Sequence, residues 1–222
     1  MTGRPAYQPH EVIPQDVAKV MAASANWFVI GGQAIRCIAP YRPSRDVDLG
    51  VREAKDLQGL LASFRSSGKV EILEQTDDTV HLLLNGVKIS IFVLDHLADF
   101  SDDQRLNREG ILATKLHAIL DRGTRRDFFD LYIVLQIEGL GIIEALSAMR
   151  KVYRQEINES LLLRALTYFD DADREAPLPG EGPKDWENVK KFFYHRVGDL
   201  LVPPGARLKI QSNVVDVHSG KV

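Results

Sequence analysis

The sequence feature that most constrains this chain is an apolar run at 28–30 that stops at a glycine pair, Gly31-Gly32, and is followed by two carboxylates one residue apart, Asp46 and Asp48. Glycine lets the backbone approach a phosphate closely, and a helix that starts just after the pair would point free N–H groups and the positive end of its dipole at that phosphate. A strand, a glycine bend and paired acids, in this order, predict a site for a nucleotide and its metal ions.

The segment that carries the acids alternates with a period of two. Val47, Leu49 and Val51 alternate with Asp46 and Asp48, so the carboxylates are expected on one face of a strand and the apolar side chains in the core. Side chains two residues apart on a strand are about 6.6 Å apart at Cα and can converge on one hard cation. The two acids would raise each other's pKa, and a divalent cation removes that penalty. Mg²⁺ fits best.

Taken alone, each half of this signal has an ordinary explanation. A glycine pair after a strand is often only a tight turn, and an Asp-x-Asp sequence is often a solvated strand face. The combination, in this order, favours a nucleotide site.

Composition excludes several classes of protein. The chain has 222 residues, 45% of them hydrophobic and 27% charged, which suits one large globular domain or two small ones. We find no run of 18 apolar residues and no apolar signal-peptide core, so we expect a cytoplasmic protein with no membrane segment. The one cysteine, Cys37, excludes an internal disulfide framework and is expected in the core. The net charge of −3 argues against bulk binding of nucleic acid, although arginines cluster around the acid pair and can bind a nucleotide or an RNA end locally.

The first half of the chain mixes helix and strand patterns, as an α/β sheet does. Asn85-Gly86, between two strand-like runs, is a favoured hairpin turn. Helices are predicted at 15–25, from Gln33 and at 54–65, and strands at 27–30, 46–51, 70–73, 79–84 and 87–94.

The second half shows the 3.6-residue period of helices from about Asn107 onward. The polar stretch 99–104 marks the boundary between the halves, and the Pro/Gly-rich segment 176–183 is a loop. Helices are predicted at 108–120, 126–137, 142–153, 158–168 and 184–200, and the tail after 203–205 has little helical pattern.

Two charged residues fall on apolar helix faces in the second half. Helical spacing puts Lys115 inside an apolar arc, and Asp130 lies on a helix that is apolar nearly all round. Each needs a partner of opposite charge. They could form a buried ion pair that fixes helix packing, or could face the site, with Lys115 on a triphosphate and Asp130 on the acceptor or the lysine; we favour the second. Asp127 is explained equally well as a cap of its helix.

The histidines give no sign of a metal site. His81 and His117 lack the spacing of metal ligands, so each is expected to be a satisfied or exposed histidine and no zinc site is predicted.

Several segments together resemble the motifs of the AbiEii/AbiGii toxin family. These proteins are nucleotidyltransferases of the DNA polymerase beta-like superfamily and are related to the mycobacterial MenT toxins. The resemblance spans roughly residues 26–137. The segments that carry it, in the family's order, are Gly31-Gly32, Arg42-Pro43-Ser44-Arg45, Asp46-Val47-Asp48-Leu49, Ala113-Thr114-Lys115-Leu116-His117-Ala118 and Arg126-Asp127-Phe128-Phe129-Asp130-Leu131-Tyr132.

The resemblance implies an α+β protein. Residues 1–100 would form a polymerase-beta-like nucleotidyltransferase domain, with a mixed sheet and flanking helices, and 101–222 a helical bundle. The implied activity is Mg²⁺-dependent transfer of a nucleotidyl group from an NTP to an acceptor hydroxyl, with RNA such as a tRNA 3′ end as acceptor. The implied setting is a toxin–antitoxin or phage-abortive-infection system, with a cognate antitoxin protein as partner.

The resemblance also implies a role for each matched residue. Arg45 would add a charge-assisted contact to phosphate. Asp46 and Asp48 would hold metal, Gly31 and Gly32 would lie under the triphosphate, and Lys115 and Asp130 match later catalytic positions.

Two positions depart from the family pattern. Gly32 stands where a serine is common, which removes a hydroxyl from the phosphate site. Ser90 stands on a later strand where the superfamily has a third carboxylate, and it is a poor general base. Asp130 could supply the base, or one metal could suffice. The alternatives are a nucleotidyltransferase that modifies a small molecule, such as an aminoglycoside, and a degenerate module that binds nucleotide without catalysis.

Overall fold

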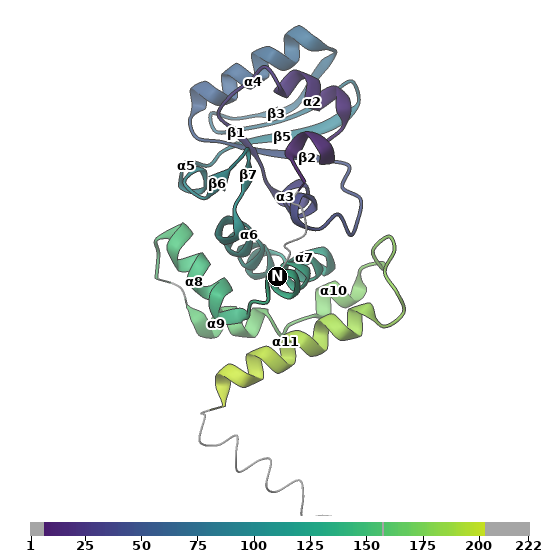
Figure 1. Ribbon diagram of the computed structural model, residues 1–222, viewed down its shortest axis with the longest axis vertical. Helices are drawn as coiled ribbons and strands as arrows, with labels where there is room; N and C mark the ends of the chain where they lie inside the picture. Colours follow the sequence, from purple (N-terminus) through teal and green to yellow (C-terminus); the bar gives the residue numbers. More distant parts are fainter. Residues whose placement is uncertain (1–6, 157, 203–222) are drawn as a thin grey trace, which may run out of the picture.

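A computed structural model describes residues 7–156 and 158–202, and within them a seven-stranded mixed sheet is followed by a group of helices. Figure 1 shows the sheet with α2 and α4 in the upper part of the molecule, the helices α6 to α11 in the lower part, and α3 between them. The predicted α+β architecture, with flanking helices and a helical second half, is confirmed. The tail after 203–205 lies outside the described residues.

The strands lie in the order β3-β4-β5-β2-β1-β7-β6. β2 pairs in parallel with β5, and β1 pairs in parallel with β7, whereas the other neighbours are antiparallel. The strand bounds are β1 Trp27–Val29, β2 Val47–Val51, β3 Val70–Gln75, β4 Thr79–Leu84, β5 Val87–Val93, β6 Ser101–Asp102 and β7 Arg105–Leu106.

The core forms where the apolar residues of each strand share a face. Ile89 and Ile91 of β5 are fully buried, as are Val47 and Leu49 of β2, and α4 packs against both strands. The opposite face of β2 and β5 carries the polar residues, as a period of two requires. Cys37 is buried, as predicted.

The helices follow the predicted pattern closely in the second half. The predicted helices of that half appear within a few residues of their expected ends, although the one expected at 158–168 stops at Ala165. The helix bounds are α1 Pro9–Val12, α2 Gln15–Met21, α3 Gly31–Ile38, α4 Ala54–Ser67, α5 Asp95–Ala98, α6 Arg108–Asp121, α7 Arg125–Glu138, α8 Ile142–Tyr153, α9 Glu159–Ala165, α10 Asp170–Arg174 and α11 Asp185–Leu201.

Three details differ from the sequence expectation. The helix expected from Gln33 begins at Gly31, so the glycine pair forms its first turn. Asp46 precedes β2 and is not part of it. The strands β6 and β7 extend the sheet to Leu106, so helical structure takes over at α6.

In the described part of the chain, no single helix is long and apolar enough to cross a membrane. Only α7 and α8 together reach that length and composition, and they are bent by 108° relative to each other.

Candidate active site

The glycine bend and the second acid lie against each other. Gly31 has a φ of +57°, a conformation that favours glycine, and a Cβ added there would lie 2.8 Å from Oδ2 of Asp48. A Cβ added at Gly32 would lie 2.7 Å from Oγ of Ser44 and 3.5 Å from a terminal nitrogen of Arg42. A side chain at Gly31 would therefore clash with the Asp48 carboxylate, and a side chain at Gly32 would clash with Ser44.

The acid pair is held by the backbone around it. Asp48 lies on β2 and is half-buried, whereas Asp46 is exposed just before the strand. The side-chain amide of Gln33, a fully buried residue of α3, donates to the carbonyls of Ser44 and Asp46 at 3.3 and 3.0 Å. The helix that carries the glycine bend thus also fixes the segment that leads into the acids.

The Asp48 carboxylate has an unfavourable environment for its charge. Burial, and then the neighbouring charge of Asp46, raise the pKa of Asp48, while Lys115, Lys88 and Arg122 act in the opposite direction. Among residues 7–156 and 158–202, no hydrogen-bond donor or cation contacts either carboxylate. A half-buried carboxylate without a partner is expected to bind a cation.

The donor set fits Mg²⁺. This ion takes one or two carboxylates, retains several waters and completes its shell with substrate phosphates. No group of three or more His, Cys, Asp or Glu side chains suited to a metal occurs in the described part of the chain. Asp46 and Asp48 therefore suit a magnesium ion that arrives with a polyphosphate, and not a metal held by protein ligands alone.

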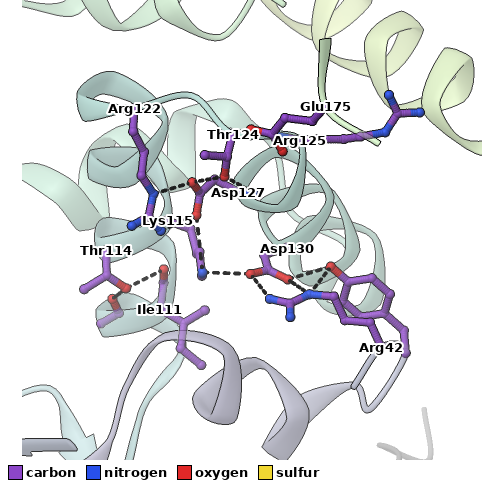
Figure 2. A network of polar contacts seen from close by, with 12 residues as sticks. Arg42, Ile111, Thr114, Lys115, Arg122, Thr124, Arg125, Asp127, Asp130 and Glu175 are labelled. Atoms are coloured by element: carbon purple, nitrogen blue, oxygen red, sulfur yellow. Dashed lines mark hydrogen bonds and ion pairs between the residues drawn. The ribbon is translucent and has the colours of Figure 1, made fainter. Parts of the chain in front are cut away.

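A second cluster centres on Asp130, as Figure 2 shows. Nζ of Lys115 lies 2.7 Å from Oδ2 of Asp130, and a terminal nitrogen of Arg42 donates to the same oxygen at 2.7 Å. Nε of Arg42 and the hydroxyl of Tyr41 donate to Oδ1 at 3.0 and 2.5 Å. Lys115, Arg42 and Asp130 are all buried, so Lys115 and Asp130 form the buried ion pair that we had not favoured from the sequence, with Arg42 as a further cation.

The protonation states of this cluster follow from its contacts. Burial alone would raise the pKa of Asp130, but the charges and hydrogen bonds of Lys115 and Arg42 outweigh burial and lower it. Burial and the charge of Asp130 raise the pKa of Tyr41 well above its ordinary value. Asp130 is thus a carboxylate whose two oxygens already accept four donors, and Tyr41 remains a donor.

Asp127 is a second anion beside Lys115. Its Oδ1 lies 3.6 Å from Nζ of Lys115, and its oxygens accept hydrogen bonds from Arg122 at 2.8 and 2.9 Å and from the Thr124 hydroxyl at 2.5 Å. Thr124 caps α7, and the carboxylate of Asp127 binds side chains instead of capping the helix as the sequence suggested. Lys115 therefore lies between two buried carboxylates.

The remaining residues highlighted in the sequence take different positions. Ser90 is buried on β5 directly opposite Asp48 in the parallel register. Arg45 is exposed beside Asp46 and makes no hydrogen bond or ion pair with any other described residue. Sequence reasoning did not assign roles to Tyr41 and Arg42, which reach Asp130 from nearly ninety residues away in the chain.

Comparisons with known proteins bear on the class of protein and on the fold. A family model described as "Nucleotidyl transferase AbiEii toxin, Type IV TA system" matches residues 99–202. An uncharacterized protein of Aquifex aeolicus (strain VF5) is 29% identical over 186 residues, which cover 79% of this chain and 88% of that protein. A crystal structure of a "putative nucleotidyltransferase" from H. pylori has a TM-score of 0.54 and 18% identity, with 86% of this chain and 94% of the other covered.

The predicted enzyme class, a nucleotidyltransferase, is confirmed by the family match, and the H. pylori structure shows the same fold. The predicted resemblance to the AbiEii nucleotidyltransferase toxins is also confirmed. The matched range contains Lys115, Asp127 and Asp130 and does not reach the glycine bend or the acid pair. The assignment of those N-terminal residues depends on the geometry described above.

We predict that Asp130→Asn destabilises the protein by about 3–5 kcal/mol, because it leaves the buried charges of Lys115 and Arg42 without their shared partner. Urea unfolding at pH 7 measures this loss. Asp16→Asn breaks an exposed pair with Lys19 and should change stability by less than about 1 kcal/mol.

The stability that Asp130 contributes should also depend on pH. Since the pKa of Asp130 is lowered in the folded state, this stability is present above an ordinary aspartate pKa of about 3.9 and is lost as the pH falls through the lower folded value. Equal stability of Asp130→Asn and wild type would contradict the described network.

Asp48→Asn should have the opposite effect on stability. Because the folded pKa of Asp48 is raised, ionisation of this residue lowers stability progressively as the pH rises above the unfolded pKa, and the loss is complete above the folded pKa. In the absence of divalent cations, the variant should melt at a higher temperature than wild type at pH 7, and the difference should shrink as the pH falls toward about 3.9. Differential scanning calorimetry tests this, with the exposed Asp77→Asn as the matched control. A lower melting temperature for Asp48→Asn would show that the carboxylate has a partner.

Proposed function

We propose that this chain is a Mg²⁺-dependent enzyme that transfers the nucleotidyl group of an NTP to a hydroxyl of RNA, such as a tRNA 3′ end. We further propose that it acts as the toxin of a toxin–antitoxin or phage-abortive-infection system and is neutralised by a cognate antitoxin protein. The observation that carries the proposal is the half-buried carboxylate of Asp48, which contacts no donor or cation among the described residues and whose Oδ2 lies 2.8 Å from where a Cβ at Gly31 would stand. The family match supports the nucleotide substrate and an antitoxin.

The acid pair and the glycine bend would both bind the polyphosphate of the NTP. Asp46 and Asp48 would bind Mg²⁺, which when present neutralises charge that builds up on the phosphate oxygens. Gly31 and Gly32 form the first turn of α3, so their N–H groups are available to donate to phosphate oxygens. Arg45, exposed beside Asp46, would add a contact to the polyphosphate from the solvent side.

The Asp130 cluster would supply fixed positive charge. Lys115 lies between Asp127 and Asp130, and its charge is close enough to Asp48 to affect the pKa of that residue. An ammonium held in place in this way can stabilise the leaving pyrophosphate without reorganising during the reaction. Because its oxygens are occupied and its pKa is lowered, Asp130 would act by orienting Lys115 and Arg42, and it is poorly suited to accept a proton.

The reaction would be an in-line displacement at the α-phosphorus. The acceptor hydroxyl forms a bond to this phosphorus, the bond to the bridging oxygen of the leaving pyrophosphate breaks, and the hydroxyl proton passes to a base. The side chains described so far would bind the nucleotide and stabilise charge, and a separate group has to receive the proton.

A second candidate function follows from Ser90. Because this residue stands where the superfamily has a third carboxylate, the chain could bind a nucleotide with Mg²⁺ and not transfer it. The two candidates differ in one observable, the release of pyrophosphate.

The test is incubation with each of the four α-labelled NTPs, Mg²⁺ and total RNA. We expect label in RNA with at least one NTP, and Asp48→Ala or removal of Mg²⁺ with EDTA should lower the rate by about 100-fold or more. Asp77→Ala, which changes an exposed acid away from the acid pair, should retain the wild-type rate.

The outcomes separate the alternatives. Label in small molecules and not in RNA would contradict the proposed acceptor, and bound nucleotide without pyrophosphate release would favour the non-catalytic module. Full activity of Asp48→Ala would remove this residue from the mechanism. Growth arrest on expression, relieved by the product of an adjacent reading frame, would support the toxin role.

A further inference from the structure

A histidine and a serine form a close pair beside the acid pair. Nδ1 of His81, on β4, lies 2.9 Å from Oγ of Ser90, on β5. Ser90 is only 5% exposed, and His81 is half-buried with its ring edge-to-face against Phe92 at 5.6 Å. The histidine that showed no metal-ligand spacing in the sequence thus has a specific partner.

The sheet register aligns this pair with the proposed metal site. Ser90 is the direct partner of Asp48 across the parallel β2–β5 pair and of His81 across the antiparallel β4–β5 pair. Ile89 and Ile91, on either side of Ser90, are fully buried in the core. Since side chains alternate along a strand, Asp48, Ser90 and His81 form a row on the face opposite the core.

None of the described carboxylates at the proposed site is free to accept the proton. Asp130 already accepts four donors, and the carboxylates of Asp46 and Asp48 are assigned to the metal. A serine alone is a poor base, but a serine whose hydroxyl is bonded to a neutral imidazole can pass a proton to it. In the neutral tautomer with its proton on Nε2, the imidazole of His81 accepts a hydrogen bond from the Ser90 hydroxyl at Nδ1.

We propose that Ser90 and His81 together receive the proton of the acceptor hydroxyl. This inference rests on the proposed function. The acceptor oxygen bonds to the α-phosphorus and its proton moves to Oγ of Ser90. The Ser90 proton moves to Nδ1 of His81, and pyrophosphate leaves with the electron pair of the broken bond. Ser90 meets the acceptor, and His81 acts through Ser90 as a positioning residue.

The test compares variants of the full chain in the labelled-NTP assay. His81→Gln keeps a polar side chain that cannot take the proton and should lower kcat by about 100-fold or more, with the KM for NTP within about twofold of wild type. Ser90→Ala should lower kcat similarly without removing the imidazole. The control is His117→Gln, since His117 stacks on Tyr153 in the helical half and should not affect transfer.

A rescue variant distinguishes this role from a merely structural one. In the His81→Gln background, Ser90→Asp restores a carboxylate at the superfamily position, so we expect kcat to recover at least tenfold relative to His81→Gln alone. Melting curves of each variant verify that all of them are folded.

The outcomes separate this inference from the proposed function. Wild-type transfer that requires Asp48 and persists at full kcat in His81→Gln would overturn the inference alone. An effect of His81→Gln on KM only, or no recovery in the double variant, would overturn it as well. A wild-type protein that transfers no nucleotide would overturn both.

Discussion

The rest of the structure depends on the buried hydrogen bonds and ion pairs of the Asp130 carboxylate. It accepts hydrogen bonds from Tyr41 and Arg42, which follow the glycine-bearing helix, and from Lys115 in the helical half. Arg42 in turn lies beside Gly32. One buried anion therefore joins the two halves of the chain and holds two cations beside the proposed nucleotide site. Removing one partner from this network would leave a buried charge uncompensated, which is strongly destabilising. The positions of the three charged side chains are therefore tightly constrained.

Three acids illustrate how the same side chain serves structure or function. Asp130 and Asp127 are fully buried, and the cations and hydrogen-bond donors around them outweigh the effect of burial on their charge. Asp48 is half-buried, has a raised pKa, and among the described residues has no donor for its carboxylate. Proteins retain such an unfavourable charge where a ligand compensates it. The loss of stability that Asp48 causes is therefore an indication of a ligand-binding site.

Local patterns in the sequence predicted the faces on which these residues lie. The alternation around Asp48 put it on the face opposite the core, and the apolar arc around Lys115 required an anionic partner, which Asp130 supplies. The contact of Tyr41 with Asp130 joins residues 89 positions apart, and no local period encodes such a pairing. Short elements such as β6 and α1 are also too brief to show a period.

The central claim is that Asp48 and the glycine bend bind a divalent cation together with a polyphosphate, and calorimetric titration with a non-hydrolysable NTP analogue tests it most directly. The account predicts that binding requires Mg²⁺, weakens by at least about tenfold in Asp48→Asn, and is unchanged in Asp77→Asn. Binding of equal affinity in the presence of EDTA, or in Asp48→Asn, would contradict it.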